Sequence, residues 1–146
     1  MVSDVFKILA SRHGGVSGNT STIFDLTASS TSTLVLTIPN GYVYYLLSYG
    51  GNVQTPGVTI QMLDRASREI EGFQNFPDSF VRFELVPFIQ ENFRDRVQAY
   101  FNNTSASTNT ITFFIEGVLI PERNYLAFED ELYQYASLGV SGRKCI

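Results

Sequence analysis

The chain has 146 residues and a mass of 16.3 kDa, which is the length of one domain with short extensions. Hydrophobic residues make up 44% of it, which argues against disorder, and no apolar run reaches the roughly 18 residues of a transmembrane helix. The formal net charge of −4 disfavours nucleic acid, whose binding requires clustered Lys and Arg. We therefore expect a soluble globular protein that binds neither nucleic acid nor a membrane.

The composition also restricts the chemistry that the chain can carry. A single cysteine, Cys145, excludes an intrachain disulfide and a cysteine-based zinc site, and a single histidine, His13, excludes sites with two or three histidines. We expect no metal and no cofactor. Only 16% of the residues are charged and 14% are aromatic, a balance typical of half-buried β-sheet surfaces and of neutral surfaces covered by other subunits.

The first 19 residues predict an extended N-terminal arm. A short apolar cluster over residues 5–9 precedes the glycine-rich stretch 13–18. This segment has too little apolar area to fold alone, so we expect it to dock on another part of the protein or on a neighbour.

Residues 20–121 predict an all-β core. Short apolar runs alternate with turn-forming residues, and the Pro39-Asn40-Gly41 turn is the strongest break between them. This spacing is typical of an antiparallel β-sandwich or jelly roll of about seven or eight strands. The expected strands cover residues 20–27, 33–38, 42–49, 58–63, 79–89, 96–101 and 110–120.

Two polar connections in this core suggest local hairpins. Residues 28–32 are rich in serine and threonine and form either a hairpin or a loop, and residues 102–109 form the tip of a closing hairpin. The runs Leu34–Val35–Leu36 and Phe113–Phe114–Ile115 are apolar on both faces of their strands, so we expect their outer faces to meet another layer or another subunit.

Residues 122–146 predict a C-terminal helix followed by a tail. Apolar side chains recur at helical spacing after Asn124, a plausible N-cap, and Gly139 is expected to end the helix. Like the first arm, this segment must dock on something. We expect the apolar side chains of the two arms to form the interface with neighbouring subunits: Phe6, Ile8, Leu9, Tyr125, Phe128 and Leu132.

No arrangement of residues predicts an enzyme. His13 lies beside two glycines and Cys145 is the penultimate residue, so neither is placed for a rigid nucleophile–base pair. Glu84 and Glu116 could form the carboxylate pair of a glycoside hydrolase, but Glu116 is more simply explained by an ion pair with Arg82 or Arg123. We therefore expect no catalytic residue.

Tyrosines offer one alternative of a different class, a carbohydrate-binding sandwich. Tyr42, Tyr45 and Tyr49 could stack on sugars, but strand alternation places Tyr42 and Tyr44 on one face with Leu46, where packing in the core is the simpler interpretation.

The β core and its arms together resemble the capsid decoration (cement) proteins of tailed bacteriophages. The features that carry the resemblance are the opening TLVLTIPNGYVYYLLS of residues 33–48, the closing RVQAYFNNTSASTNTITFFIEGVLIP of residues 96–121, and a short arm at each end. The resemblance covers residues 20–121, with residues 1–19 and 122–146 as the two arms.

Such a resemblance implies a jelly-roll-like sandwich on the outside of the phage head. The protein would act as a trimer that clamps neighbouring major capsid subunits, and it would be made in the host cytoplasm. A phage neck, tail or fibre-attachment component is the alternative within the same kind of particle. In either case the chain would stabilise an assembly through many copies of a modest contact.

Overall fold

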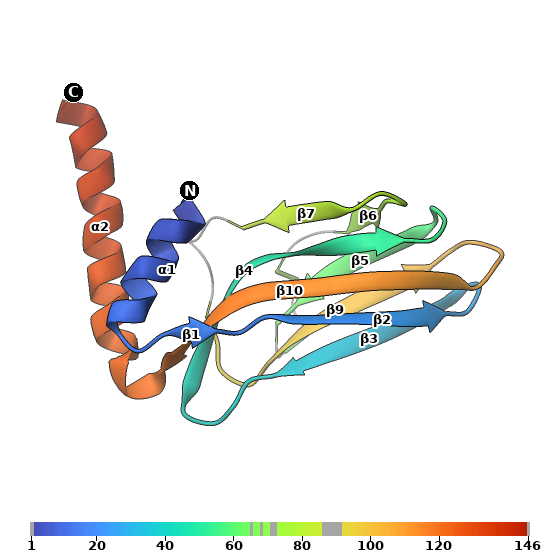
Figure 1. Cartoon of the computed structure of the whole chain (residues 1–146), viewed down its shortest axis with the longest axis horizontal. Coiled ribbons are helices and arrows are strands. Elements are labelled where there is room, and N and C mark those ends of the chain that lie inside the picture. Colours follow the sequence, from blue (N-terminus) through green and yellow to red (C-terminus); the bar gives the residue numbers. More distant parts are fainter. Residues whose placement is uncertain (1, 65, 68, 71–72, 86–91, 146) are drawn as a thin grey trace.

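The computed structural model describes residues 2–64, 66–67, 69–70, 73–85 and 92–145, and the side chains of all of these except residues 2–3, 92 and 136–145. Its strands form two antiparallel sheets that face each other (Figure 1). The first sheet contains β1 (Val16–Ser17), β2 (Thr20–Leu26), β4 (Tyr42–Val53), β7 (Val81–Glu84), β8 (Asn92–Phe93) and β10 (Asn109–Pro121). The second contains β3 (Ser30–Thr37), β5 (Val58–Leu63), β6 (Gln74–Phe76) and β9 (Arg96–Asn103).

The strand pairing is that of a jelly roll, which confirms the predicted fold class. In the first sheet β2 pairs with β10, β10 with β4, and β4 with β7. In the second, β3 pairs with β9, β9 with β5, and β5 with β6. The eight principal strands are therefore nested, first with last and second with second-last, as in a long antiparallel ribbon rolled onto itself.

The closing hairpin predicted at residues 102–109 is wrong, and of the two alternatives for residues 28–32 the loop is the correct one. β2 and β3 lie in different sheets, and so do β9 and β10, so each connection crosses the edge of the sandwich. Asn103, which is fully buried, holds these two crossings together: its amide nitrogen lies 3.0 Å from the carbonyl oxygen of Leu26 and 3.1 Å from that of Ser107. In these two connections, which pass from one sheet to the other, the buried amide of Asn103 therefore satisfies backbone carbonyl groups.

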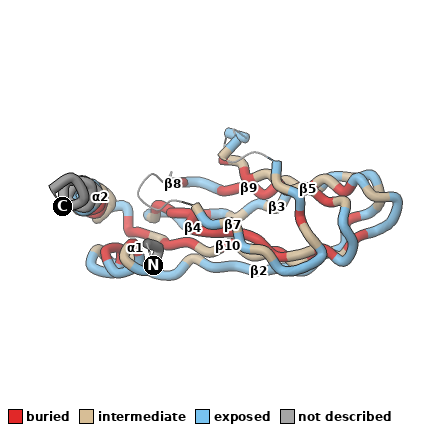
Figure 2. Tube along the Cα trace, turned by 90° about the horizontal axis from the view of Figure 1, so that it is seen from above, coloured by how far each residue is buried: buried red, intermediate tan, exposed pale blue. Residues whose placement is uncertain are grey.

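The main core is formed by residues from strands of both sheets, and Figure 2 shows the buried positions of these strands in red. In β5, Val58, Ile60 and Met62 point inward while the residues between them are half-buried, as strand alternation requires. Tyr44 and Leu46 of β4 also lie in this core, which confirms the interpretation of their alternation.

Two helices pack against the outer face of the first sheet at one end of the sandwich (Figure 1). The predicted extended arm is wrong in conformation, because residues Val2–Arg12 form the helix α1 with Phe6, Leu9 and Ala10 buried at helical spacing. A short 3₁₀ helix, Glu122–Asn124, leads into α2 (Tyr125–Cys145), which continues past the expected end at Gly139.

A second apolar cluster joins these helices to the sheet. The ring of Phe128 lies 5.3 Å from the rings of both Phe6 and Tyr45, in edge-to-face contacts, and it is fully buried. Val43 and Ile120 contribute from β4 and β10. β4 is thus buried on both faces, because its residues belong to both clusters. The two arms share the second cluster with the sheet. That the core folds without them, as the predicted division of the chain implies, stays a prediction.

Candidate binding surfaces

One side of the sandwich is formed by two edge strands. Among the described residues, β2 pairs only with β10 and β3 only with β9, so each leaves one row of backbone groups without a strand partner. β3 carries no charged residue. β2 carries one, Asp25, whose carboxylate accepts a hydrogen bond of 2.7 Å from the hydroxyl of Thr110. Charges, prolines and bulges are the usual protection of an exposed edge, and this side has almost none of them.

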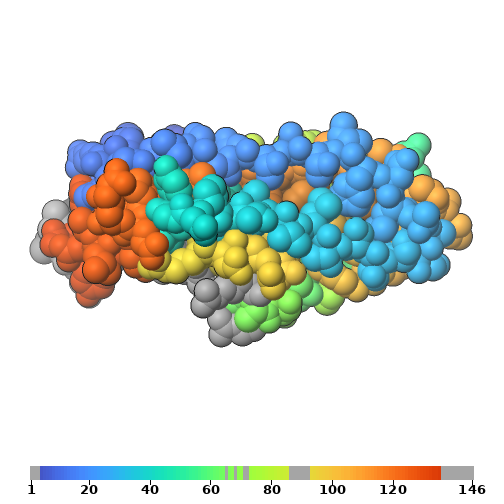
Figure 3. Space-filling model, turned by 90° about the horizontal axis from the view of Figure 1, so that it is seen from below, coloured from blue at the N-terminus to red at the C-terminus, as the bar shows by residue number. Residues whose placement is uncertain are grey.

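An apolar groove runs between these two edges. A pocket of about 180 Å³ opens between β2 and β3 and is lined by Leu34, Leu36, Phe113 and Ile115 together with the threonines of β2. A second pocket of about 360 Å³ continues it toward Tyr44 and Leu119. Figure 3 shows the surface hollowed between β2 in blue and β3 in cyan, with the orange of β10 below. The interior of the sandwich therefore reaches solvent along this side.

The outer face of the first sheet carries the carboxylates that the sequence singled out. Glu116 lies 3.3 Å from the Nζ of Lys7 and 3.5 Å from an Nη of Arg82, which confirms the predicted ion pair with Arg82. Glu116 and Glu84 flank Ser48 in register, because β4 separates their strands. Glu116 is thus held by two cations.

The histidine lies at the helical end of the molecule, against α2. His13 Nε2 lies 2.5 Å from Glu131 of α2, and an Nη of Arg12 lies 2.8 Å from the same carboxylate. The hydrogen bond from His13, reinforced by the one from Arg12, lowers the pKa of Glu131 from its ordinary value of 4.5. This contact fastens α1 to α2. The side chain of Cys145 lies outside the described residues.

The six predicted interface residues are distributed unequally. Phe6, Leu9, Phe128 and Leu132 are buried in the cluster beneath the chain's own helices, and Tyr125 packs against it. Ile8 is 58% exposed. Their contact with another subunit stays a prediction.

The sequence interpretation missed the most exposed apolar side chain of the groove side, Ile23, which is 70% exposed. Val35, which is 53% exposed, belongs to the run Leu34–Val35–Leu36, whose outer face the sequence predicts to meet another layer or subunit. Its contact with a second layer or subunit stays a prediction.

The tyrosines proposed for sugar stacking do not form a surface. Tyr45 and Tyr49 are completely buried, so the stacking interpretation is wrong for these two residues, and Tyr42 is half-buried and packs against the main core. Tyr44 is also buried, and its hydroxyl donates a 2.8 Å hydrogen bond to the carbonyl oxygen of Gly18. Burial, with a smaller effect of the Glu116 charge, raises the pKa of Tyr44.

In the part of the chain that the structure describes, no group of three or more His, Cys, Asp or Glu side chains is placed to hold a metal ion. Within the same residues, no helix has the length and apolar character needed to span a membrane.

Comparison with known proteins adds little beyond the architecture. No protein-family model and no curated protein sequence matches the chain. Similar solved structures include the coat protein of Tobacco streak virus, at 12% identity over 73% of this chain and 85% of that chain, with a TM-score of 0.44. A protein of the disulfide-linked pili of Bacillus endospore appendages is 14% identical over 73% of this chain and 89% of that chain, with a TM-score of 0.43. At these values the similarity carries no argument about function.

Proposed function

We propose that the chain is a structural protein of a phage particle that binds the outside of the head and stabilises the shell by clamping neighbouring major capsid subunits. The observation that supports this most is the open side of the sandwich, where β2 and β3 expose unpaired edges around an apolar groove. Such an edge is a template for pairing with another chain. On assembly, neighbouring subunits would cover the edges of β2 and β3 and the apolar groove between them.

The surface charge supports the same function. β3 offers eight residues without a charge, so a neighbouring subunit can approach it without desolvating an ion. The many copies of a shell would multiply a weak contact of this kind into a stable structure. We propose a homotrimer as the form that binds the major capsid protein, and we assign no catalytic role to the chain.

Immunogold electron microscopy tests this function. An antibody raised against the purified chain is applied to intact virions of the phage whose genome encodes it, with virions of an unrelated phage as control. We expect gold particles over the head surface. Labelling confined to the neck, tail or fibres would replace the head assignment by the alternative location, and virions without label would exclude a role on the particle surface.

A further inference from the structure

The part of the first sheet that the helices leave uncovered carries an ordered stack of side chains. Phe114 lies opposite Gly50 in register, and a Cβ atom at Gly50 would come within 3.0 Å of its ring. The absent side chain lets the Phe114 ring lie across β4 toward β7. There the rings of Phe80 and Phe114 are nearly parallel, with centroids 5.5 Å apart and planes at 11°. Cζ of Arg82 lies 4.7 Å from the centroid of the Phe114 ring.

This stack has one free end. Phe80 is 64% exposed, an unusual state for a phenylalanine that is held in a defined orientation by a second ring. Arg82 is fixed in turn, because it donates a 2.8 Å hydrogen bond to Ser48 and pairs with Glu116. The exposed face of Phe80 is therefore a pre-oriented apolar platform rather than a loose side chain.

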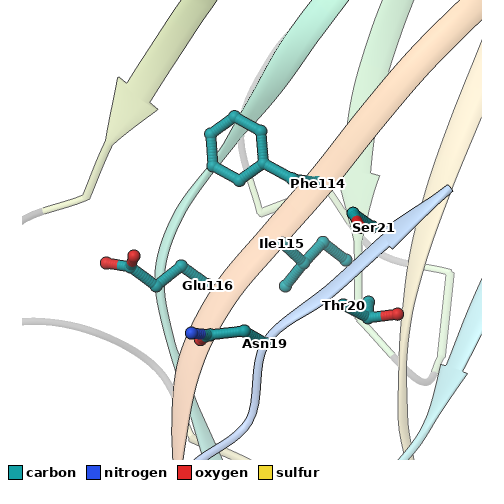
Figure 4. A pocket seen from close by; sticks show the side chains of 6 residues that line it. All are labelled: Asn19, Thr20, Ser21, Phe114, Ile115 and Glu116. Carbon is teal, nitrogen blue, oxygen red and sulfur yellow. The ribbon is translucent and has the colours of Figure 1, made fainter.

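Polar side chains line a pocket beside Phe114, the inner ring of the stack. A pocket of about 440 Å³ beside Phe114 is lined by Glu116 and by Asn19, Thr20 and Ser21 (Figure 4). The amide of Asn19 and the carboxylate of Glu116 lie on the same side of β10 as the Phe114 ring. The amide oxygen of Asn19 accepts a 3.2 Å hydrogen bond from the Gly117 backbone, which fixes the direction of its NH₂ group.

The exposed ring of Phe80 stacks on Phe114, and Phe114 lines a pocket that contains carboxylate, amide and hydroxyl groups, a combination that matches the chemistry of a sugar. A pyranose presents an apolar C–H face and a rim of hydroxyls, which can donate to carboxylates and accept from amides. We propose that the uncovered half of this face binds an oligosaccharide, with Phe80 stacking on one ring and the Asn19–Glu116 pocket holding hydroxyls of another.

Binding of immobilised and free sugars tests this site. The whole chain is applied to an array of hexasaccharides built from glucose, mannose, galactose or N-acetylglucosamine, and cellohexaose, mannohexaose and chitohexaose are titrated by calorimetry. We expect binding to at least one of these saccharides. Phe80→Ala should weaken it by about tenfold or more, because the stacking contact is lost.

Phe73→Ala is the matched control, since Phe73 is also an exposed phenylalanine (58%), packed edge-on against Tyr100 of the other sheet. This variant should bind as the unchanged chain does. Binding to none of the saccharides, or equal losses in the two variants, would overturn the proposal. The mass in solution separates it from the proposed assembly: if Phe80→Ala alters the mass and leaves sugar binding intact, the face is a subunit contact and not a sugar site.

Discussion

Phe128 is the side chain that most directly ties the C-terminal helix to the sheet. It is fully buried between Phe6 and Tyr45, so its removal leaves a cavity that these rings cannot easily fill. We expect Phe128→Ala to lower the free energy of unfolding by about 3–5 kcal/mol in urea denaturation. Tyr133→Ala, on the same helix but 72% exposed, should change it by no more than about 0.5 kcal/mol. Equal effects of the two substitutions would show that the second cluster is not a core.

Glu131 gives the contact between the helices a dependence on pH. Because the hydrogen bonds from His13 and Arg12 lower its pKa below 4.5, its ionised form stabilises the folded state. This stabilisation is complete above the ordinary pKa and is lost as the pH falls through the lower folded value. Between about pH 6 and about pH 3, the melting temperature should therefore fall more steeply for the unchanged chain than for Glu131→Gln.

Asp130→Asn provides the control for this measurement, because Asp130 is the adjacent carboxylate on α2 and accepts a hydrogen bond from Gln134 of the same helix. Thermal melts followed by circular dichroism compare the three proteins. Parallel pH profiles for the unchanged chain and Glu131→Gln would contradict the assigned role of this carboxylate.

Edge strand β3 is the element on which the proposed assembly depends. Val35 lies at its middle, 53% exposed, and a lysine there would place a charge on an edge that has none. We expect Val35→Lys to fold with an unchanged melting temperature and to dissociate the assembly into single chains, as measured by light scattering. Asn102→Lys introduces the same charge on β9, between β3 and β5, and should leave the assembly intact. Persistence of the assembly in Val35→Lys would exclude β3 as its contact.

Local patterns predicted the individual strands better than their partners. Alternation locates β5, whose buried and half-buried residues alternate, whereas β4 and β10 are located as apolar runs between turn-forming residues. It could not distinguish a hairpin from a crossing between sheets, because the polar loops that precede β3 and β10 look the same in either case. The helix α1 was missed although Phe6, Leu9 and Ala10 have helical spacing, since the adjacent glycines suggested an irregular arm.

The candidate binding surfaces were harder to predict from the sequence than the strands, because they combine residues from strands that are distant in the chain. Glu116 and Arg82 could be paired from their residue types, but the stack of Phe80, Phe114 and Arg82 requires β7 and β10 to lie on either side of Gly50. Likewise, the groove exists only because β2 and β3 end their sheets on the same side. These features arise from tertiary pairing, which no short stretch of sequence encodes.

At the scale of the molecule, one side of the jelly roll has few of the usual protections of an exposed edge, and the chain's own helices cover the outer face of the first sheet at one end. This combination is expected of a subunit that is stable alone but completed by neighbours. The mass of the purified chain at high concentration, measured by size exclusion with light scattering, tests this most directly. We predict a trimer, three times the 16.3 kDa of one chain, and a single species of 16.3 kDa at every concentration would contradict it.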